Sequence, residues 1–301
     1  MLFRSHATED FVLLTGYLAW FCTWHSHFFK GGNYLNKAVI KGGKQTEAYA
    51  RVIGGAGMIS IFTGEPEAGL KLNIESLETW RHLDNKKEIA SKLTDMSNSN
   101  QALGNAETGL KYAEEGLSLA MQVDQAGLLN YCRSGVCQGL VALKKIDSAR
   151  AMAQLLLESS TELEQPAMMR LGYHFIADCD LLEEKYLMSE KAYCSALEIA
   201  FRTGNMFFVC IELLGLSMAL AGQSKLAKAI RISTVSREYA LQNRILVPEN
   251  LGYTFWQEFI KIYLVKAREE LGEKLNLEYE EEGKKMGIEE AIEYALDIEN
   301  A

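Results

Sequence analysis

The sequence predicts an all-α fold, a right-handed α-solenoid in which helix pairs of about 40 residues stack between helical caps. Two observations carry this prediction. One pattern of small and apolar residues recurs along the chain, with copies that begin at residues 64, 104, 144 and 184 and a fifth at residue 222. The chain of 301 residues also holds only three prolines, so little in it interrupts a helix.

Residues 1–46 are predicted to form an N-terminal cap of two aromatic helices. The run FVLLTGYLAWFCTWHSHFF, residues 11–29, has no charged side chain, but two acidic residues precede it where a signal peptide is basic. A membrane helix is the weaker alternative, because polar residues gather in the second half of the run. His25 and His27 are two positions apart, so a helix would turn them to different faces and they could not share one metal ion.

Five helix pairs are predicted over residues 47–245. Each copy has a small residue five positions after its start and an apolar residue thirteen positions after it. The small residues are Gly69, Gly109, Ala149, Ser189 and Ala227, and the apolar ones are Leu77, Leu117, Leu157, Leu197 and Val235. The turns between the paired helices are expected near residues 64, 104, 144, 184 and 222, with Lys144 and Glu184 in place of glycine. Pairs that cannot bury their apolar faces alone stack on one another, which gives the solenoid.

Residues 246–301 are predicted to form C-terminal capping helices after Pro248. This part of the chain contains the tail LGEKLNLEYEEEGKKMGIEEA, from Leu271 to Ala291. Its acidic run from Glu278 to Glu282 is expected to be the solvated end of a helix.

The repeat turns and the stretch Glu75-Ser76-Leu77 resemble tetratricopeptide repeats of a longer, roughly 40-residue type. Together with the aromatic opening helix and the closing tail, they resemble the C-terminal helical region of bacterial signal-transduction ATPases and of LuxR-type or MalT-like transcriptional regulators. The resemblance implies a sensor or scaffold arm, either freestanding or part of a longer regulator whose upstream ATPase and DNA-binding domains would be partners. The motifs of those domains do not occur in this sequence, so the resemblance assigns no residue to ATP hydrolysis or DNA binding.

Composition and motifs argue against several classes of function. The net charge of −9 disfavours direct binding of nucleic acid, which relies on clustered Lys and Arg. Six cysteines without a CxxC pair are typical of reduced thiols, and we expect a cytoplasmic protein. No phosphate-binding loop and no recognised nucleophile motif occurs in the sequence, so we expect neither enzymatic activity nor a cofactor nor a metal.

The register of the repeats also selects candidate binding residues. In tetratricopeptide folds the first helix of each pair faces the concave side, and positions ten and six residues before each turn point inward. The candidates chosen in this way are Thr94, Asn98, Ser134, Gln138, His174, Asp178 and Glu212. Their polar side chains suit an extended peptide or a small polar ligand, although they also suit the solvated face of a helix. His174 and Asp178 are one turn apart and are expected to interact locally rather than as a catalytic pair.

We therefore expect a non-catalytic module of a bacterial regulatory protein that binds a protein or peptide in its concave groove. A domain that holds a small metabolite effector for a transcriptional regulator is the alternative, and an unrecognised enzyme is the third hypothesis. If the chain belongs to a longer regulator, part of an aromatic set in the first cap should form an exposed docking patch. The members of this set are Trp20, Phe21, Trp24 and Phe28.

Overall fold

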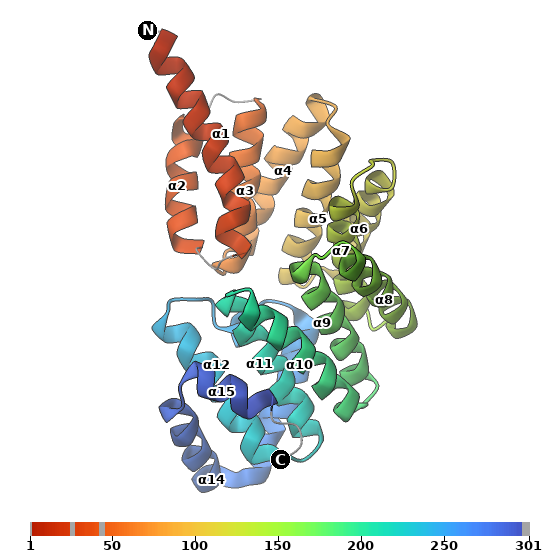
Figure 1. Ribbon diagram of the computed structural model, residues 1–301, viewed down its shortest axis with the longest axis vertical. Helices are drawn as coiled ribbons and strands as arrows, with labels where there is room; N and C mark the ends of the chain where they lie inside the picture. Colours follow the sequence, from red (N-terminus) through yellow and green to blue (C-terminus); the bar gives the residue numbers. More distant parts are fainter. Residues whose placement is uncertain (1, 25–27, 42–45, 297–301) are drawn as a thin grey trace. The chain divides into compact units, whose positions relative to one another are not determined.

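The computed structural model describes residues 2–24, 28–41 and 46–296, and within these ranges every regular element is a helix (Figure 1). The helices of the first half are α1 (Leu2–Trp24), α2 (Phe28–Lys41), α3 (Glu47–Phe62), α4 (Pro66–His82), α5 (Lys86–Ala102), α6 (Ala106–Ala120) and α7 (Ala126–Ala142). Those of the second half are α8 (Ile146–Glu162), α9 (Pro166–Leu182), α10 (Tyr186–Arg202), α11 (Met206–Gly222), α12 (Leu226–Gln242), η1 (Pro248–Asn250), α13 (Thr254–Phe259), η2 (Ile260–Val265), α14 (Lys266–Lys285) and α15 (Ile288–Leu296). Consecutive helices pack against one another from α1 to α6 and from α8 to α12, so the predicted all-α solenoid of helix pairs is confirmed.

The turns repeat every 20 residues, which is half the period seen in the sequence. Most of the helices from α4 to α12 are 17 residues long, and each of them begins 20 residues after the one before it. Residues with a positive φ follow nearly all of the helices from α3 to α12: Gly64, Asp84, Gly104, Lys144, Glu164, Glu184, Gly204, Ser224 and Arg244. The N–H after each one returns to a carbonyl in the last turn, as Lys145 N–H does to Leu140 O at 2.9 Å. This is the hydrogen bond of a Schellman cap.

The turn of the fifth pair lies two residues beyond the predicted position. The left-handed residue is Ser224, with φ 62°, so the turns keep an unbroken 40-residue spacing after Glu184. Gly222 is instead the last residue of α11, and a Cβ placed on it would lie 2.4 Å from the ring of Tyr186. Its small size therefore serves close packing rather than the turn. The buried small residue of this pair is accordingly Ala229 instead of Ala227.

The chain divides into two compact units, residues 1–139 and residues 140–301, with the division inside α7. In unit 1, α4 and α5 bury Trp80 and Leu93 against Ala50 of α3. In unit 2, α11 is buried on every side from Phe207 to Leu220.

One polar contact occurs in both units at the same position of the repeat. The hydroxyl of Ser76 donates to Ala50 O at 2.7 Å, and the hydroxyl of Ser236 donates to Cys210 O at 2.8 Å. Both side chains are buried and join the second helix of a pair to the first. The two units thus share the same packing between paired helices.

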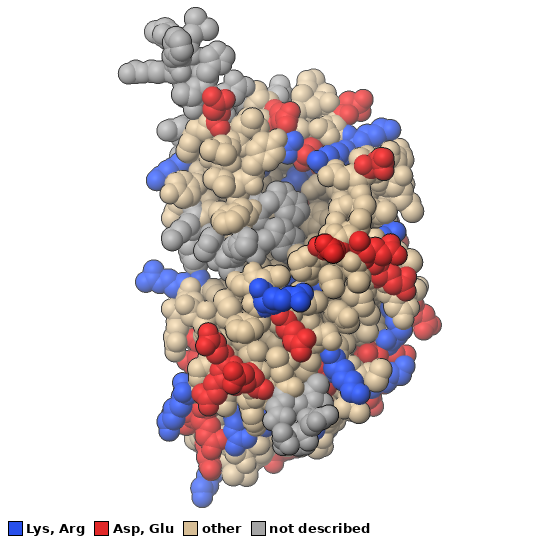
Figure 2. Space-filling view, viewed as in Figure 1, with Lys and Arg blue, Asp and Glu red and all other residues tan. Residues whose placement is uncertain are grey.

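The C-terminal helices of unit 2 pack on two different layers of the repeats. α14 and α15 lie against α12, the second helix of its pair, whereas η2 lies against α11, the first helix. The helical geometry is broken at Gly272, which has φ 71°, and η2 has π-helical geometry. Acidic side chains gather over α14 and α15 (Figure 2). Glu278, Glu281 and Glu282 are exposed, as expected for the solvated acidic run.

No helix in the described part of the chain is both long and apolar enough to cross a membrane. The predicted helix of the opening run is α1, which ends at Trp24. His25 and His27 lie outside the described residues.

Candidate binding residues of the repeat helices

In unit 1 the predicted binding residues divide into buried and partly exposed ones. Thr94 of α5 is buried, and its hydroxyl donates to Ala90 O at 3.2 Å. Ser134 of α7 is also buried and donates to Tyr131 O at 2.7 Å. Asn98 and Gln138, one turn further along α5 and α7, are only half-buried. The Ser134 hydroxyl is thus used within its own helix, and the Thr94 hydroxyl also lies 3.3 Å from Cys132 Sγ of α7. The two amides face partly towards solvent.

An ion pair lies beside this row and was not predicted from the sequence. Lys92 of α5 pairs with Asp95 one turn away, and the hydroxyl of Tyr131 on α7 donates to the same carboxylate. Lys92 and Asp95 are buried, and Tyr131 is partly buried. The Lys92 side chain passes close to Gly54 of α3, where an added Cβ would lie 2.9 Å from Lys92 Nζ. Gly54 thus gives a buried lysine room between neighbouring helices.

In unit 2 the remaining predicted residues meet in one buried cluster. His174 Nδ1 of α9 lies 2.9 Å from Glu212 Oε2 of α11, and His174 Nε2 lies 3.5 Å from Asp178 Oδ2. The carboxylate of Glu212 also forms an ion pair with Arg170. The local interaction expected between His174 and Asp178 is therefore present. Glu212 was selected with the turn placed at Gly222 rather than Ser224, yet it lies directly against His174.

Three members of this cluster were missed by the sequence reasoning. Tyr193 of α10 donates its hydroxyl to Asp178 Oδ1 at 2.6 Å, and Arg170 lies one turn before His174 on α9. The third, Trp256 of α13, stacks on the imidazole of His174 with ring centroids 5.5 Å apart and planes inclined by 20°. Spacing along α9 could have found Arg170, because it lies four positions before His174. Nothing in the sequence places Tyr193 or Trp256 there.

Charges within the cluster shift the pKa values of its members. Burial alone would lower the pKa of His174, but the carboxylates of Glu212 and Asp178 outweigh it and raise that pKa above 6.5. Burial raises the pKa of Asp178 to about 6. For Glu212, burial acts to raise the pKa, yet His174 and Arg170 more than offset this and lower it. The arrangement is a charge-balanced network that favours an ionised Glu212 and a protonated His174.

The chemistry of this cluster is that of packing and ion pairing. Each member is buried, and the guanidinium of Arg170 lies 3.7 Å from the centroid of the Phe208 ring. In the described ranges no three side chains of His, Cys, Asp or Glu are arranged to hold a metal ion. Glu212 accepts from both cationic neighbours, so its carboxylate is fully used within the fold.

The aromatic set of the first cap is split by the structure. Phe21 of α1 is 52% exposed, whereas Phe28 of α2 is 3% exposed and stacks on Phe62 with ring centroids 5.3 Å apart. The side chains of Trp20 and Trp24 lie outside the described residues. Phe21 belongs to an exposed apolar surface on α1 and α2. Its other members are Leu14, Tyr17, Leu18 and Tyr34.

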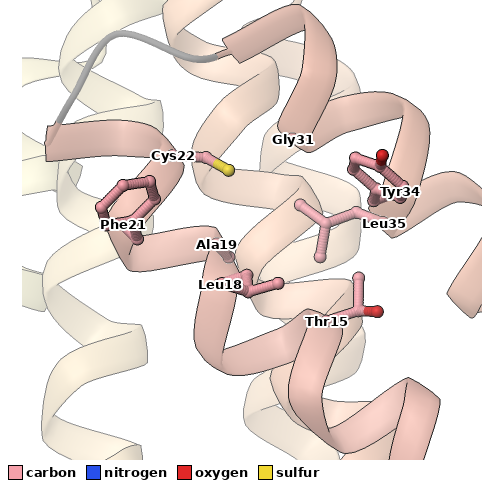
Figure 3. A pocket seen from close by; sticks show the side chains of 8 residues that line it. All are labelled: Thr15, Leu18, Ala19, Phe21, Cys22, Gly31, Tyr34 and Leu35. Atoms are coloured by element: carbon pink, nitrogen blue, oxygen red, sulfur yellow. The ribbon is translucent and has the colours of Figure 1, made fainter.

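A pocket of about 210 Å³ opens beside Phe21, between α1 and α2 (Figure 3). It is lined by Thr15, Leu18, Ala19, Phe21 and Cys22 of α1 and by Gly31, Tyr34 and Leu35 of α2. Its wall is apolar, because the Thr15 hydroxyl donates back to Phe11 O at 2.7 Å. None of the residues chosen by the repeat register lines this pocket.

Comparison with known proteins identifies the fold and no more. No protein-family model matches the chain, and no curated protein matches it. Among solved structures, a Rap protein complexed with competence and sporulation factor aligns over 88% of this chain and 77% of its own, with a TM-score of 0.61 and 14% identity. The apo form of RapI aligns over 96% of this chain and 99% of its own, with a TM-score of 0.49 and 12% identity. The chain is therefore similar in fold to the helical-repeat Rap protein of that complex.

Proposed function

We propose that the chain is a non-catalytic module of a bacterial regulatory protein, and that it binds a peptide or protein segment on the first helices of its repeats. The observation that carries the proposal is the pair Asn98 and Gln138. These two amides occupy the same position in consecutive repeats, on α5 and α7, and both remain partly exposed. A primary amide both donates and accepts hydrogen bonds, so a row of them can pair with the N–H and C=O groups of an extended segment.

The fold comparison supports a binding role of this kind. The Rap protein of similar fold was solved with competence and sporulation factor bound. At 14% identity this likeness concerns the fold, so the choice of contact residues depends on Asn98 and Gln138 themselves.

We further propose that the module works within a longer regulator of the LuxR or MalT type, as the opening helix and closing tail suggest. The exposed apolar surface around Phe21 would then be where an upstream domain docks. A small-metabolite effector is the less favoured alternative. It calls for an enclosed polar pocket, whereas the pocket between α1 and α2 is apolar and lies away from the amide row.

The proposal can be tested with a randomised peptide library displayed on phage and selected against the wild-type protein. Peptides that are enriched would be synthesised with a fluorescent label, and their affinity measured by fluorescence polarisation for wild type and for the N98A/Q138A double variant. Each lost hydrogen bond is worth about 0.5–1.5 kcal/mol, so we expect the double variant to bind about tenfold more weakly or worse.

Ser134→Ala is the matched control, because that hydroxyl is buried and bonded within its own helix. It should leave peptide affinity unchanged. Equal affinity of wild type and the double variant, with circular dichroism showing both folded, would contradict the role of the amide row. Failure to enrich any peptide would contradict peptide binding itself.

A further inference from the structure

The C-terminal segment formed by α13 and η2 crosses the first helices of unit 2, on the side where the register placed binding residues. Trp256 stacks on His174 of α9, and the hydroxyl of Tyr263 donates to Leu181 O at the end of the same helix, at 3.2 Å. η2 packs along α11. The segment therefore covers His174 and Asp178. Of these two, Asp178 stands in the same repeat register as the half-buried Asn98 and Gln138 of unit 1.

The segment is held by a row of aromatic and aliphatic side chains on one face. Phe255, Trp256, Phe259 and Leu264 are buried, and Tyr263 packs edge-on against Tyr186 with ring centroids 5.8 Å apart. The other face is exposed, including Gln257, Lys261 and Ile262. This is the pattern of an amphipathic helix laid on a receiving surface, a recognised mode of peptide binding.

α13 and η2 run without a break into the first turns of α14, up to the break at Gly272. Within this stretch η2 has π-helical geometry, which interrupts the regular α-helical hydrogen bonding. Besides the hydrogen bond of Tyr263, the segment is tied to the repeats by the ion pair between Glu258 and Lys144, at 2.7 Å, with both side chains about half exposed. Such a pair contributes little. The aromatic anchors are thus what keep the segment in place.

Arg170, four positions before His174 on α9, has unused hydrogen-bonding capacity. Within the described part of the chain, Nε and Nη2 of the buried Arg170 donate no hydrogen bond, and only Nη1 reaches Glu212. Buried donors left unpaired cost stability. The unpaired donors therefore leave the buried cluster of unit 2 short of full hydrogen bonding.

We propose that α13 and η2 act as a built-in, displaceable ligand of unit 2, and that the face of α9 and α11 is a recognition surface for an amphipathic helical segment with aromatic anchors at the spacing of Trp256, Phe259 and Tyr263. A partner segment of this chemistry takes the place of residues 254–265 while α14 and α15 remain docked on α12. The inference goes beyond the proposed function, because it concerns a helical partner on the first helices of unit 2 rather than the amide row of unit 1.

The test uses a fluorescently labelled synthetic peptide of residues 250–266 and the full-length W256A/F259A variant, whose own anchors are removed. We expect the peptide to bind this variant at least tenfold more tightly than wild type. A peptide carrying Trp256→Ala should not bind. Ile262→Ala in the full-length protein is the matched control, because Ile262 lies on the same segment but is exposed. This variant should bind the peptide no more tightly than the wild type does.

Hydrogen exchange of the wild-type protein provides a second readout that does not depend on the variant folding. Amides of residues 254–265 should exchange through local opening, faster than those of α11 and independently of low denaturant concentrations. Exchange of the segment only together with α11 would show that it is ordinary core and would overturn the proposal. So would a folded variant that fails to bind the peptide. Neither result bears on the amides of unit 1, so failure here is separable from failure of the proposed function.

Discussion

The same register position has opposite environments in the two units. In unit 1 it holds Asn98 and Gln138, two uncharged amides that are half-buried on α5 and α7. In unit 2 it holds Asp178, a carboxylate fully buried beside His174, which lies under Trp256. The repeat decides which helix face a residue occupies, but a segment that folds back from elsewhere in the chain decides whether that face is open.

The side chains at these positions match their environments. A half-exposed amide can exchange its hydrogen bonds with water or with a ligand, so it requires no partner within the fold. A buried carboxylate requires compensation, and Asp178 obtains it from Tyr193 and His174. The first arrangement suits binding, while the second contributes to stability.

The largest expected effect comes from removing one charge of the unit 2 cluster. Glu212→Gln would leave Arg170 and His174 without their shared carboxylate, and breaking a buried pair in this way costs about 3–5 kcal/mol. Gln138→Ala, at the half-exposed position of unit 1, should change stability by only about 0.5 kcal/mol. Urea unfolding of the two variants measures both free energies.

A double variant, R170M/E212L, distinguishes loss of charge balance from loss of packing. Replacing both partners with apolar residues of similar size should recover most of the loss. If Glu212→Gln costs less than about 1 kcal/mol, the cluster is not the stabilising network described here.

The second effect is a pH dependence that belongs to unit 2. Because the pKa of His174 is raised above 6.5 in the folded state, the folded chain holds that proton more tightly than the unfolded chain does. The contribution of protonated His174 to the free energy of unfolding is complete below pH 6.5. It is lost as the pH rises through the pKa that His174 has in the folded state. Asp178 acts in the same direction at lower pH, between 3.8 and about 6. The charged and titratable groups that face His174 are Arg170, Asp178, Tyr193 and Glu212.

Urea unfolding from about pH 6 to pH 9 checks this sign. The free energy of unfolding of the wild type should fall with rising pH, and in His174→Gln the fall should be smaller. His82→Gln, which changes an exposed histidine of unit 1, should keep the wild-type slope. Parallel slopes for all three proteins would remove His174 as the source.

The smallest effect concerns the turns within the helix pairs. The residue with positive φ is a glycine in unit 1, at Gly64 and Gly104, whereas in unit 2 Lys144 and Glu184 have this conformation. Glu184 has φ 58°, a conformation that costs a residue with a Cβ about 1 kcal/mol. Glu184→Gly should therefore raise the free energy of unfolding, measured by thermal denaturation, by about 0.5–1 kcal/mol. Gly104→Glu should lower it by a similar amount. Lys185→Gly, at φ −83°, is the control and should gain nothing. A loss of stability in Glu184→Gly would contradict this account of the turn.

Much of the fold was predictable because one register repeats, whereas the site was predictable only in part. Five helix pairs follow from spacing alone, and the single misplaced turn arose because Gly222 is small for packing against Tyr186 rather than for the turn. Spacing also selected His174, Asp178 and Glu212, which do meet. It could not show that Trp256 covers them, because no periodicity links α13 to α9. Burial by a distant segment is a property of the tertiary fold.

The contrast between an open row in unit 1 and a covered one in unit 2 is tested most directly by locating a bound peptide. Hydrogen exchange, followed by mass spectrometry, would be measured on the wild-type protein with and without a library-selected peptide at saturation. We predict that the peptide slows exchange in α5 and α7 around Asn98 and Gln138 of the wild-type protein. In the N98A/Q138A variant, the peptide at the same concentration should leave the exchange of these helices unchanged. Protection confined to α9, α11 and α13, with α5 and α7 unaffected, would contradict the assignment of the binding row to unit 1.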